Sequence, residues 1–161
     1  MSAGTSAGKA KVVRDLEELA PRFKAAVERA VAACNENQLD AFVFETYRSP
    51  ELQASYFARG RTEIPPNATV TNALSNLDSW HGYGLAVDVV SRKQGWDQPG
   101  EWFAQVAEHF RANGCRWGGE WKMKDLPHFQ WGLCKPSPSP RAHELFALGG
   151  KRAVWEAVDA L

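Results

Sequence analysis

The sequence predicts an α+β domain in which a small, mainly antiparallel sheet carries helices on one side. Short β-prone segments do not alternate strictly with amphipathic helical segments, as a doubly wound parallel sheet would require, and no internal repeat is present. The length of 161 residues also suits one domain with a substantial core. We expect residues 1–10 to be a flexible N-terminal lead-in and residues 11–161 to form a single domain that includes a C-terminal helical tail.

The first half of the chain predicts helix, strand, helix and loop in that order. Apolar residues between positions 12 and 34 recur every three or four residues, and Pro21 is placed to restart this helix at a first-turn position. Residues 40–46 predict a strand. Residues 49–60 begin with a Ser-Pro cap and end at a glycine, which predicts a helix. Adjacent prolines and several asparagines in residues 60–76 predict a long irregular loop.

The second half predicts three further strands and a helical tail. Residues 85–90 resume a strand, and residues 99–114 place an aromatic stripe on one helical face that ends at Asn-Gly. Two short strands are expected within residues 115–121 and 128–131. The tail predicts a pair of short helices broken at the adjacent glycines 149–150.

Composition narrows the possible partners. Nineteen basic and nineteen acidic residues cancel, so no global field recruits nucleic acid or an anionic membrane. No apolar run approaches the roughly 20 residues needed to cross a bilayer, and the small, polar N-terminus does not read as a secretory signal. Three scattered cysteines without a C-x-x-C pair predict free thiols. We therefore expect no nucleic-acid partner and no membrane insertion. The chain is further expected to be a monomer.

Four ionisable residues suit a metal site of the peptidase kind. Such a site needs three ligands of His and carboxylate type, an open position for water and a separate carboxylate that moves the water's proton. His81 precedes a Gly-Tyr-Gly turn that lets the following strand bring Asp88 back toward it. His128 follows a proline that stiffens its approach. Asp125 lies three residues before His128, too differently aimed on a regular strand for both to ligate, and suits a base.

Six segments carry a resemblance to a known family. The stretches "YRSPELQ", "GRT", "VTNA", "SWHGYGLAVD", "WGGEW" and "DLPHF" are similar, in order and spacing, to those of the M15 peptidases. This family comprises zinc D-alanyl-D-alanine carboxypeptidases and L-alanyl-D-glutamate endopeptidases that hydrolyse peptidoglycan. The resemblance covers about residues 16–131. It implies the zinc fold shared by D,D-peptidases and the hedgehog signalling domain.

The resemblance also implies roles for single residues. Asp125 is the expected general base and acid, and Arg48 the expected cation that polarises the scissile carbonyl and steadies the oxyanion. Ser79 and Gln53 match positions near the cleft and are expected to bind substrate. The expected cofactor is one Zn²⁺ ion, with three ligands: His81, Asp88 and His128.

Two positions depart from the commonest pattern of the family. The expected base is an aspartate where the vancomycin-resistance dipeptidases have glutamate, which points toward the phage endolysin branch. Gln130 stands where many members have an acidic residue. The neighbour of a ligating histidine orients its ring and tunes its basicity, so the sequence leaves open whether Gln130 can do this for His128.

The expected function is zinc-dependent cleavage of the peptidoglycan stem peptide, foremost at the L-alanyl-D-glutamate bond. Two alternatives stay open: a D-alanyl-D-alanine carboxypeptidase with the same site, and a non-catalytic zinc or cell-wall-binding module. An endolysin made in the host cytoplasm without a signal peptide and released to the wall through a holin fits the N-terminal sequence.

Three tryptophans near the second ligand segment allow two interpretations. Trp117, Trp121 and Trp131 either pack in the core or form a wall on which a sugar or peptide stacks. Trp102 and Trp155 belong to helical stripes and are expected in the core.

Overall fold

The computed structural model describes residues 11–59, 71, 73 and 75–161. The expected lead-in of residues 1–10 and most of the expected loop of residues 60–76 lie outside the described residues. The elements, in chain order, are η1 (Leu16–Glu18), α2 (Pro21–Glu36), β1 (Ala41–Glu45), α3 (Pro50–Ala58), η2 (Asn76–Asp78), η3 (Trp80–Tyr83), β2 (Ala86–Ser91), α4 (Gly100–Ala112), β3 (Cys115–Trp117), η4 (Gly118–Glu120), β4 (His128–Trp131) and α5 (Pro140–Asp159), where η marks a 3₁₀ helix.

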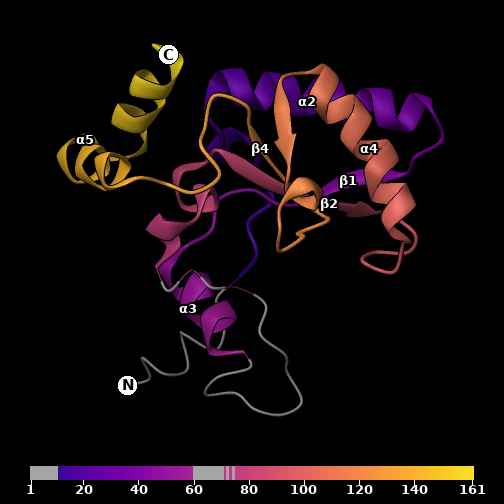
Figure 1. Cartoon of the computed structure of the whole chain (residues 1–161), viewed down its shortest axis with the longest axis horizontal. Coiled ribbons are helices and arrows are strands. Elements are labelled where there is room, and N and C mark those ends of the chain that lie inside the picture. The colour runs from indigo at the N-terminus through magenta and orange to yellow at the C-terminus, as the bar shows by residue number, and fades with distance from the viewer. Residues whose placement is uncertain (1–10, 60–70, 72, 74) are drawn as a thin grey trace.

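The strands form one sheet in the order β1-β2-β4-β3, and every neighbouring pair is antiparallel. Helices α2 and α4 lie side by side along one face of this sheet, while α3 lies on the other side of it (Figure 1). The α+β class expected from the sequence is confirmed. The face opposite α2 and α4 is therefore left for polar side chains.

The helix expected from position 12 begins later than the apolar spacing predicts. The structure has only a single 3₁₀ turn, η1, before α2 starts at Pro21. Leu19 and Ala20 between them have extended backbone angles. A residue before proline is kept out of the helical region by the proline ring, so the two segments cannot join into one helix. The strand expected over residues 115–121 likewise ends at Trp117, where η4 begins.

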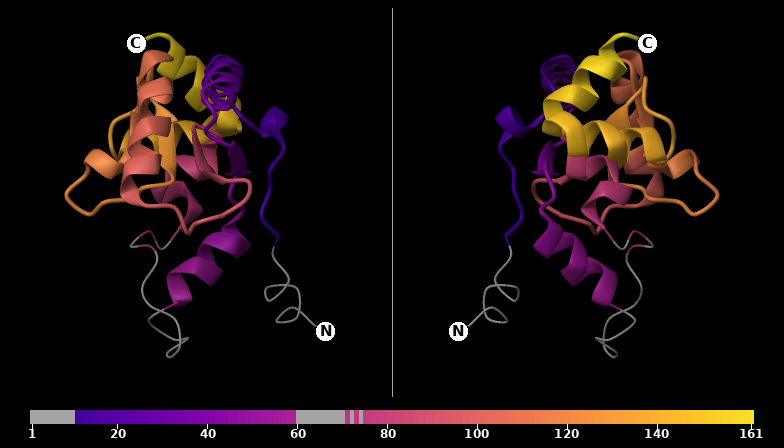
Figure 2. Two further views of the ribbon diagram at one scale, coloured as in Figure 1. Left: turned by 90° about the vertical axis from the view of Figure 1, so that its right-hand side faces the viewer. Right: turned by 90° about the vertical axis from the view of Figure 1, so that its left-hand side faces the viewer.

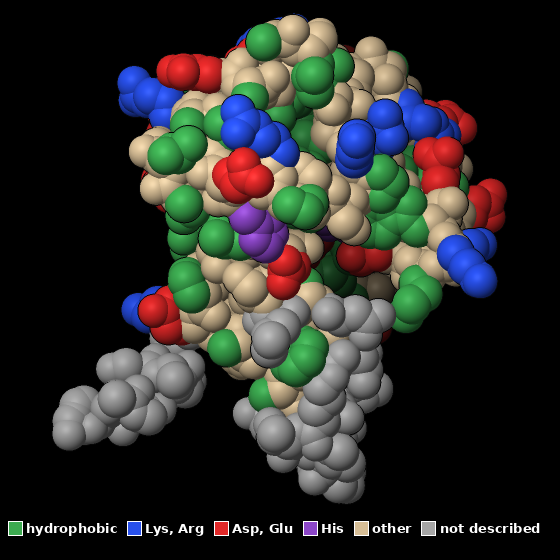
Figure 3. Space-filling model, turned by 60° about the vertical axis from the view of Figure 1, so that its left-hand side comes forward, with side chains coloured by type: hydrophobic (Ala, Val, Ile, Leu, Met, Phe, Trp, Pro, Cys, Tyr) green, Lys and Arg blue, Asp and Glu red, His purple; other side chains and the backbone are tan. Residues whose placement is uncertain are grey.

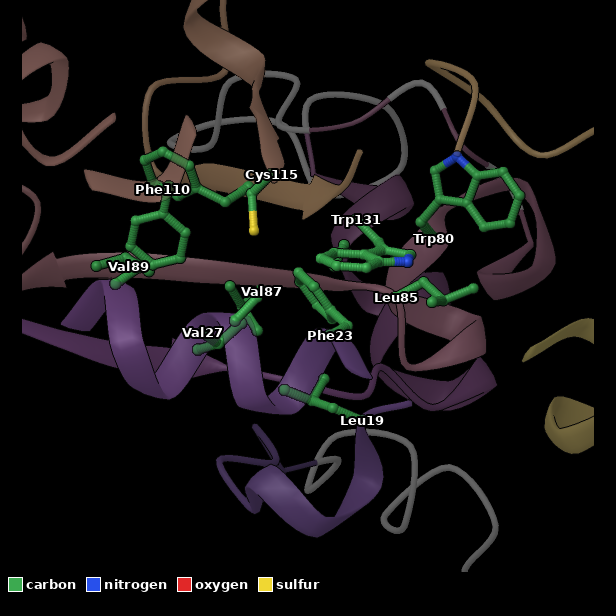
Figure 4. Close-up of a cluster of buried hydrophobic side chains, with 14 of the residues drawn as sticks. Leu19, Phe23, Val27, Trp80, Leu85, Val87, Val89, Phe110, Cys115 and Trp131 are labelled. Atoms are coloured by element: carbon green, nitrogen blue, oxygen red, sulfur yellow. The ribbon is translucent and has the colours of Figure 1, made fainter. Parts of the chain in front are cut away.

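The core fills the space between α2, α4 and the sheet. Phe23 and Val27 of α2 lie against Val87 of β2 (Figure 4). Phe110 of α4 stacks on Phe129 of β4, with ring centroids 4.2 Å apart. Burial of such apolar surface is the main source of folding free energy, so this layer holds the sheet in place. The three cysteines are free and buried: Cys34, Cys115 and Cys134.

The tail is the expected pair of helices joined at a kink. Gly149 and Gly150 have non-helical backbone angles inside α5, and Gly150 has a φ of 68° that favours glycine. Trp155 of the second helix donates its indole N–H to the Tyr83 carbonyl at 2.6 Å. The tail therefore packs against the turn that carries His81. Figure 2 shows both halves of α5 beside the rest of the molecule.

The surface carries both signs of charge. On the face drawn in Figure 3, acidic and basic side chains lie interspersed rather than segregated into one broad patch. The described part of the chain contains no helix with the length and apolar character needed to span a membrane.

Candidate metal centre

His81 sits in a tight turn that only this local sequence allows. The Ser79 hydroxyl accepts a hydrogen bond from the His81 N–H at 3.3 Å and so caps the 3₁₀ turn η3. Gly84 ends the turn with a φ of 70°, and a side chain there would collide with the Glu18 carbonyl. A side chain at Gly82 would collide with the Asn76 carbonyl. The two glycines let the chain reverse close enough for His81 to face the sheet.

Asp88 and His128 meet His81 because their strands are neighbours. Asp88 of β2 is paired directly with His128 of β4 in the antiparallel register. The His81 Nε2 lies 3.2 Å from an Asp88 carboxylate oxygen, and the His128 Nδ1 lies 3.8 Å from the same oxygen. All three side chains are buried. The structure thus brings together the three ligands expected from the sequence.

Hydrogen bonds fix which ring nitrogen of each histidine faces the candidate metal centre. His81 donates its Nδ1–H to the Thr46 carbonyl at 2.9 Å. The other ring nitrogen, Nε2, therefore carries the lone pair that can bind a metal. The Gln130 side-chain oxygen accepts from His128 Nε2 at 2.7 Å, which leaves Nδ1 with its lone pair. Gln130 in turn donates to the Lys135 carbonyl at 2.8 Å. A neutral amide therefore orients the His128 ring at the position where the sequence pattern led us to consider an acid.

This donor set fits a divalent metal ion. One donor atom from each of His81, Asp88 and His128 lies within 4.8 Å of the others. Around a tetrahedral zinc ion with bonds of about 2.0–2.1 Å, neighbouring donors are about 3.4 Å apart. The observed separations of 3.2 and 3.8 Å from the shared Asp88 oxygen bracket that value. Two imidazoles and a carboxylate with an open cavity beside them are typical of a catalytic rather than a structural site.

The protonation states also suit metal binding. Burial acts to raise the pKa of Asp88, but the attraction of His81, Arg48 and His128 outweighs it and holds that pKa well below its usual range. Burial, together with the repulsion of His81, lowers the pKa of His128 to about 4. At neutral pH the carboxylate is therefore ionised and the His128 imidazole neutral, which are the forms that ligate metals.

Asp125 lies beside the ligands without belonging to the buried set. It precedes β4 in a turn rather than on a regular strand, so its carboxylate and His128 face the same way despite the spacing of three. Its Oδ2 lies 3.9 Å from His128 Nδ1, and its side chain is 49% exposed. Partial desolvation of the carboxylate by the surrounding side chains, together with the nearby Asp88 carboxylate, raises the pKa of Asp125 to about 6. Such a group exchanges a proton near neutral pH.

Gly118 makes room for the Asp125 turn, and the sequence analysis did not single it out. Its carbonyl accepts a hydrogen bond from the Asp125 N–H at 2.9 Å. A side chain at Gly118 would lie 2.6 Å from the Asp125 carbonyl and 3.2 Å from the His128 Cβ. The two adjacent glycines of "WGGEW" were the sequence feature that could have indicated this close approach.

Arg48 is buried and held from three sides. Its Nη2 donates to Glu45 Oε1 at 2.6 Å and lies 3.5 Å from Asp88 Oδ2. Its Nη1 donates to the Gln53 side-chain oxygen at 3.1 Å, and its guanidinium lies 4.7 Å from the Tyr56 ring centroid. Burial acts to lower the pKa of Arg48, but Glu45 outweighs it and the pKa is raised. The cation is therefore permanent and fixed in direction.

Glu45 is a site residue that sequence reasoning missed. It is 1% exposed and is the main partner of Arg48. An irregularity in the pairing of β1 between Val43 and Glu45 sets it opposite Asp88. Its signal in the sequence was a charged residue at the end of an otherwise apolar strand.

Ser79 and Gln53 occupy different positions with respect to the cavity. Ser79 lines it while capping the His81 turn. Gln53 is fully buried and does not line it; its amide nitrogen donates to the Ala73 carbonyl at 2.6 Å while its oxygen holds Arg48. In the structure Gln53 therefore reaches the cavity through residues that line it, Arg48 and Ala73, rather than directly.

A cavity of about 1010 Å³ opens in front of these residues. Of the three tryptophans with two interpretations, Trp121 lines it, with its indole 4.9 Å from the His128 ring. Trp131 is buried in the core beside Phe23. Trp117 packs against the core and donates its indole N–H to the Leu126 carbonyl at 2.7 Å. Of these three tryptophans, only Trp121 therefore lines the cavity.

Comparison with known proteins agrees with this geometry. A family model of M15 peptidases described as D-alanyl-D-alanine carboxypeptidase matches residues 73–131, the segment that contains the three ligands and Asp125. The crystal structure of the L-Ala D-Glu endopeptidase ChiX of Serratia marcescens superposes with a TM-score of 0.56 and 27% sequence identity, covering 75% of this chain and 88% of that one. The chain is thus similar to M15 peptidases in sequence over residues 73–131 and in fold over three quarters of its length.

Two curated proteins that are similar to this chain have related names. The peptidoglycan L-alanyl-D-glutamate endopeptidase CwlK of Bacillus subtilis (strain 168) is 29% identical over 126 residues, which cover 70% of this chain and 73% of that protein. The L-alanyl-D-glutamate peptidase of Listeria phage A118 is 26% identical over 122 residues, which cover 73% of this chain and 39% of that protein. The match thus spans less than half of the phage protein.

Proposed function

We propose that this protein is an M15 peptidase, a zinc-dependent peptidoglycan hydrolase that cleaves the bond between L-alanine and D-glutamate in the stem peptide. One observation carries the proposal: two histidines and a carboxylate converge in a buried cluster, with a free carboxylate and a fixed arginine beside it, at the floor of a cavity. The names of the relatives support the choice of bond.

The metal would be held by His81 Nε2, an Asp88 oxygen and His128 Nδ1. Zinc is the ion that this mixed nitrogen and oxygen set suits best among common catalytic metals, since harder ions prefer oxygen alone. When bound, zinc polarises a carbonyl and lowers the pKa of a water molecule to about 7.

Asp125 would accept the proton of the attacking water and then deliver it to the leaving amine. Its exposed carboxylate can reach a substrate in the cavity, and its raised pKa of about 6 suits both directions of transfer. Because Asp125 also lies beside His128, it would hold this proton next to the reacting atoms rather than release it to bulk solvent.

Arg48 would stabilise the negative charge that develops on the carbonyl oxygen. Glu45 and Gln53 hold its guanidinium from behind, so the cation needs no rearrangement when charge appears. We propose that Gln53 positions Arg48 and that Ser79, which lines the cavity, contacts the substrate directly.

Two cations of the cavity suit an acidic peptide. Arg59 and Lys124 are among its lining residues. When the L-alanyl-D-glutamate bond is the one cut, the α-carboxylate of the glutamate lies one residue from the metal centre. A cation there would stabilise the bound peptide.

We further propose that residues 11–161 act as a single peptidase domain, monomeric, that works at the cell wall. Synthesis in a host cytoplasm and release through a holin would bring an endolysin of this kind to its substrate. Nucleic acid and membrane lipid have no part in this proposal.

Mass spectrometry of digested muropeptides tests the proposed bond. Purified stem peptides on their sugars should release a fragment that begins with D-glutamate and leave muramyl-L-alanine behind. A chelator should stop the release, and added zinc should restore it. Wall binding without any new amine would instead indicate a non-catalytic module.

A D-alanyl-D-alanine carboxypeptidase is the second candidate, since the matching family model carries that description. The same digest separates the two functions, because this activity removes only the terminal D-alanine. Its appearance without muramyl-L-alanine would overturn the endopeptidase assignment.

A further inference from the structure

One cavity residue has no role in the chemistry described so far. Trp96 lines the cavity and is 49% exposed, among the most exposed large apolar side chains that the structure describes. An indole left half in water loses the stabilisation of burial. In a cavity wall it offers a large apolar face to a ligand instead.

The Trp96 ring is held in place by a built support. Its indole packs edge-on against Phe44 of β1, with centroids 4.9 Å apart and an angle of 74° between the planes. Arg14 covers the Phe44 ring at 4.5 Å and donates to the Phe44 carbonyl at 2.8 Å. The Trp96 side chain therefore rests on a fixed pair rather than hanging from a loose loop.

The turn that leads to Trp96 is also fixed. Ser91 and Gly95 exchange two backbone hydrogen bonds of 3.1 and 2.8 Å at the end of β2. The Asp40 carboxylate accepts from the Ser91 hydroxyl at 2.8 Å and from the Lys93 N–H at 2.9 Å. A rigid aromatic surface loses little conformational entropy when it binds a ligand.

The other aromatic rings of the cavity are engaged elsewhere. Trp121 lies against the His128 ring, and Trp80 is buried with its indole N–H bonded to the Lys135 carbonyl at 2.6 Å. Tyr56 lies under the guanidinium groups of Arg48 and Arg59. Trp96 is thus the cavity aromatic best placed to accept a further group of the substrate.

The proposed substrate has such a group. The L-alanine of a stem peptide is joined through its nitrogen to the lactyl group of a muramic acid sugar. One residue spans only about 3.3–3.6 Å, so an enzyme that cuts directly after this alanine must hold the sugar close to its metal centre. The carbon-bound hydrogens of a pyranose ring form an apolar face that stacks on an indole through dispersion and burial.

We infer that Trp96, supported by Phe44, is the stacking surface for the muramic acid sugar that carries the stem peptide. This inference rests on the proposed endopeptidase function and adds the glycan to its substrate. The enzyme would then recognise a glycopeptide rather than a peptide alone.

Turnover of two matched substrates tests the inference. One is the tetrapeptide stem attached to N-acetylmuramic acid, and the other is the same stem without the sugar. The wild-type protein should cleave the first with a higher kcat/KM. Trp96→Ala should lower this preference by about tenfold while leaving kcat/KM for the free peptide unchanged. Trp96→Phe should retain part of the preference.

Met123→Ala is the matched control, because Met123 is also exposed and lines the same cavity. It should leave the ratio of the two kcat/KM values as in the wild type. A preference that survives in Trp96→Ala, or a wild-type protein that ignores the sugar, overturns the inference. Activity on the free peptide in each variant shows that the fold is intact.

Binding of the product gives a second readout that needs no turnover. The indole N–H signal of Trp96, identified by its absence from the Trp96→Phe spectrum, should shift on titration with N-acetylmuramyl-L-alanine but not with L-alanine. A signal that stays in place refutes the stacking surface. A shift in a protein that cleaves neither substrate refutes the endopeptidase function and leaves the sugar site standing.

Discussion

The two faces of the sheet use the same strands for different physical purposes. On β2, Val87 and Val89 point into the core with α2 and α4, while Asp88 between them faces the cavity. On β4, Phe129 packs in the core, and His128 on the other face turns to the metal centre. The alternation of side chains along a strand makes this division possible.

The difference shows what each face demands of its residues. The core face depends on volume and packing, so an apolar side chain of similar size can replace another at modest cost. On the cavity face, buried polar groups depend on particular partners: Gln130 on His128, and Glu45 on Arg48. Removing one partner leaves the other buried and unsatisfied. Four substitutions test this contrast.

His128→Ala should have the largest effect. Without this ligand the cluster has two donors, so zinc content should fall from about one ion per chain to none, and peptidase activity should be lost with it. Elemental analysis measures the zinc content, and a muropeptide digest measures the peptidase activity. His143→Ala, on the surface of α5, is the control and should keep both. Full zinc occupancy in His128→Ala would remove this residue from the ligand set.

Asp125→Asn should separate metal binding from catalysis. The amide cannot take a proton from water, so kcat should fall about 10²–10⁴-fold while zinc content stays at the wild-type level. Near-normal turnover in this variant would show that another group moves the proton. Calorimetric titration with zinc in parallel would show whether the variant still assembles the centre.

Gln130→Leu should weaken metal binding without abolishing it. The leucine has a similar volume but cannot accept the His128 N–H, so the dissociation constant for zinc should rise about 10–100-fold. Gln130→Glu retains an acceptor and should bind zinc at least as tightly as the leucine variant does, a comparison that isolates the hydrogen bond. Equal affinities of the wild type and Gln130→Leu would contradict an orienting role.

Phe129→Leu, next to Gln130 but on the core face, should have the smallest effect. It loses part of the stacking on Phe110, so the free energy of unfolding should fall by about 1 kcal/mol, as measured by urea denaturation. Its zinc affinity should be that of the wild type. A large loss of zinc affinity here would mean that the two faces are coupled through the strand.

Much of the site was predictable because its chemistry restricts residue types. Two histidines and a carboxylate with a second carboxylate nearby have few uses other than a catalytic metal site, and their spacing matched a family. The α+β class followed from the hydrophobic pattern in the same way. The start of the first helix was less predictable, because Pro21 and the residues before it decide it locally against the apolar spacing.

Glu45 and Trp96 show what a linear pattern leaves out. Glu45 ends an apolar strand, and only the irregular pairing with β2 turns it toward Arg48. Trp96 follows a polar turn, and only its packing on Phe44 makes it part of the cavity. The residues that orient these two side chains, Asp88 opposite Glu45 and Phe44 beneath Trp96, are distant from them in sequence, so the local pattern does not show where the side chains point.

The amino-acid sequence by itself determined which residues are chemically able to hold a metal, move a proton and face a developing charge. Tertiary structure alone decided which nitrogen of each histidine faces the other donor side chains, which carboxylate stays exposed beside them, and which aromatic ring remains open to the cavity. The physical reason is that donor direction, burial and exposure are set by neighbours in space, such as Thr46 for His81 and Gln130 for His128.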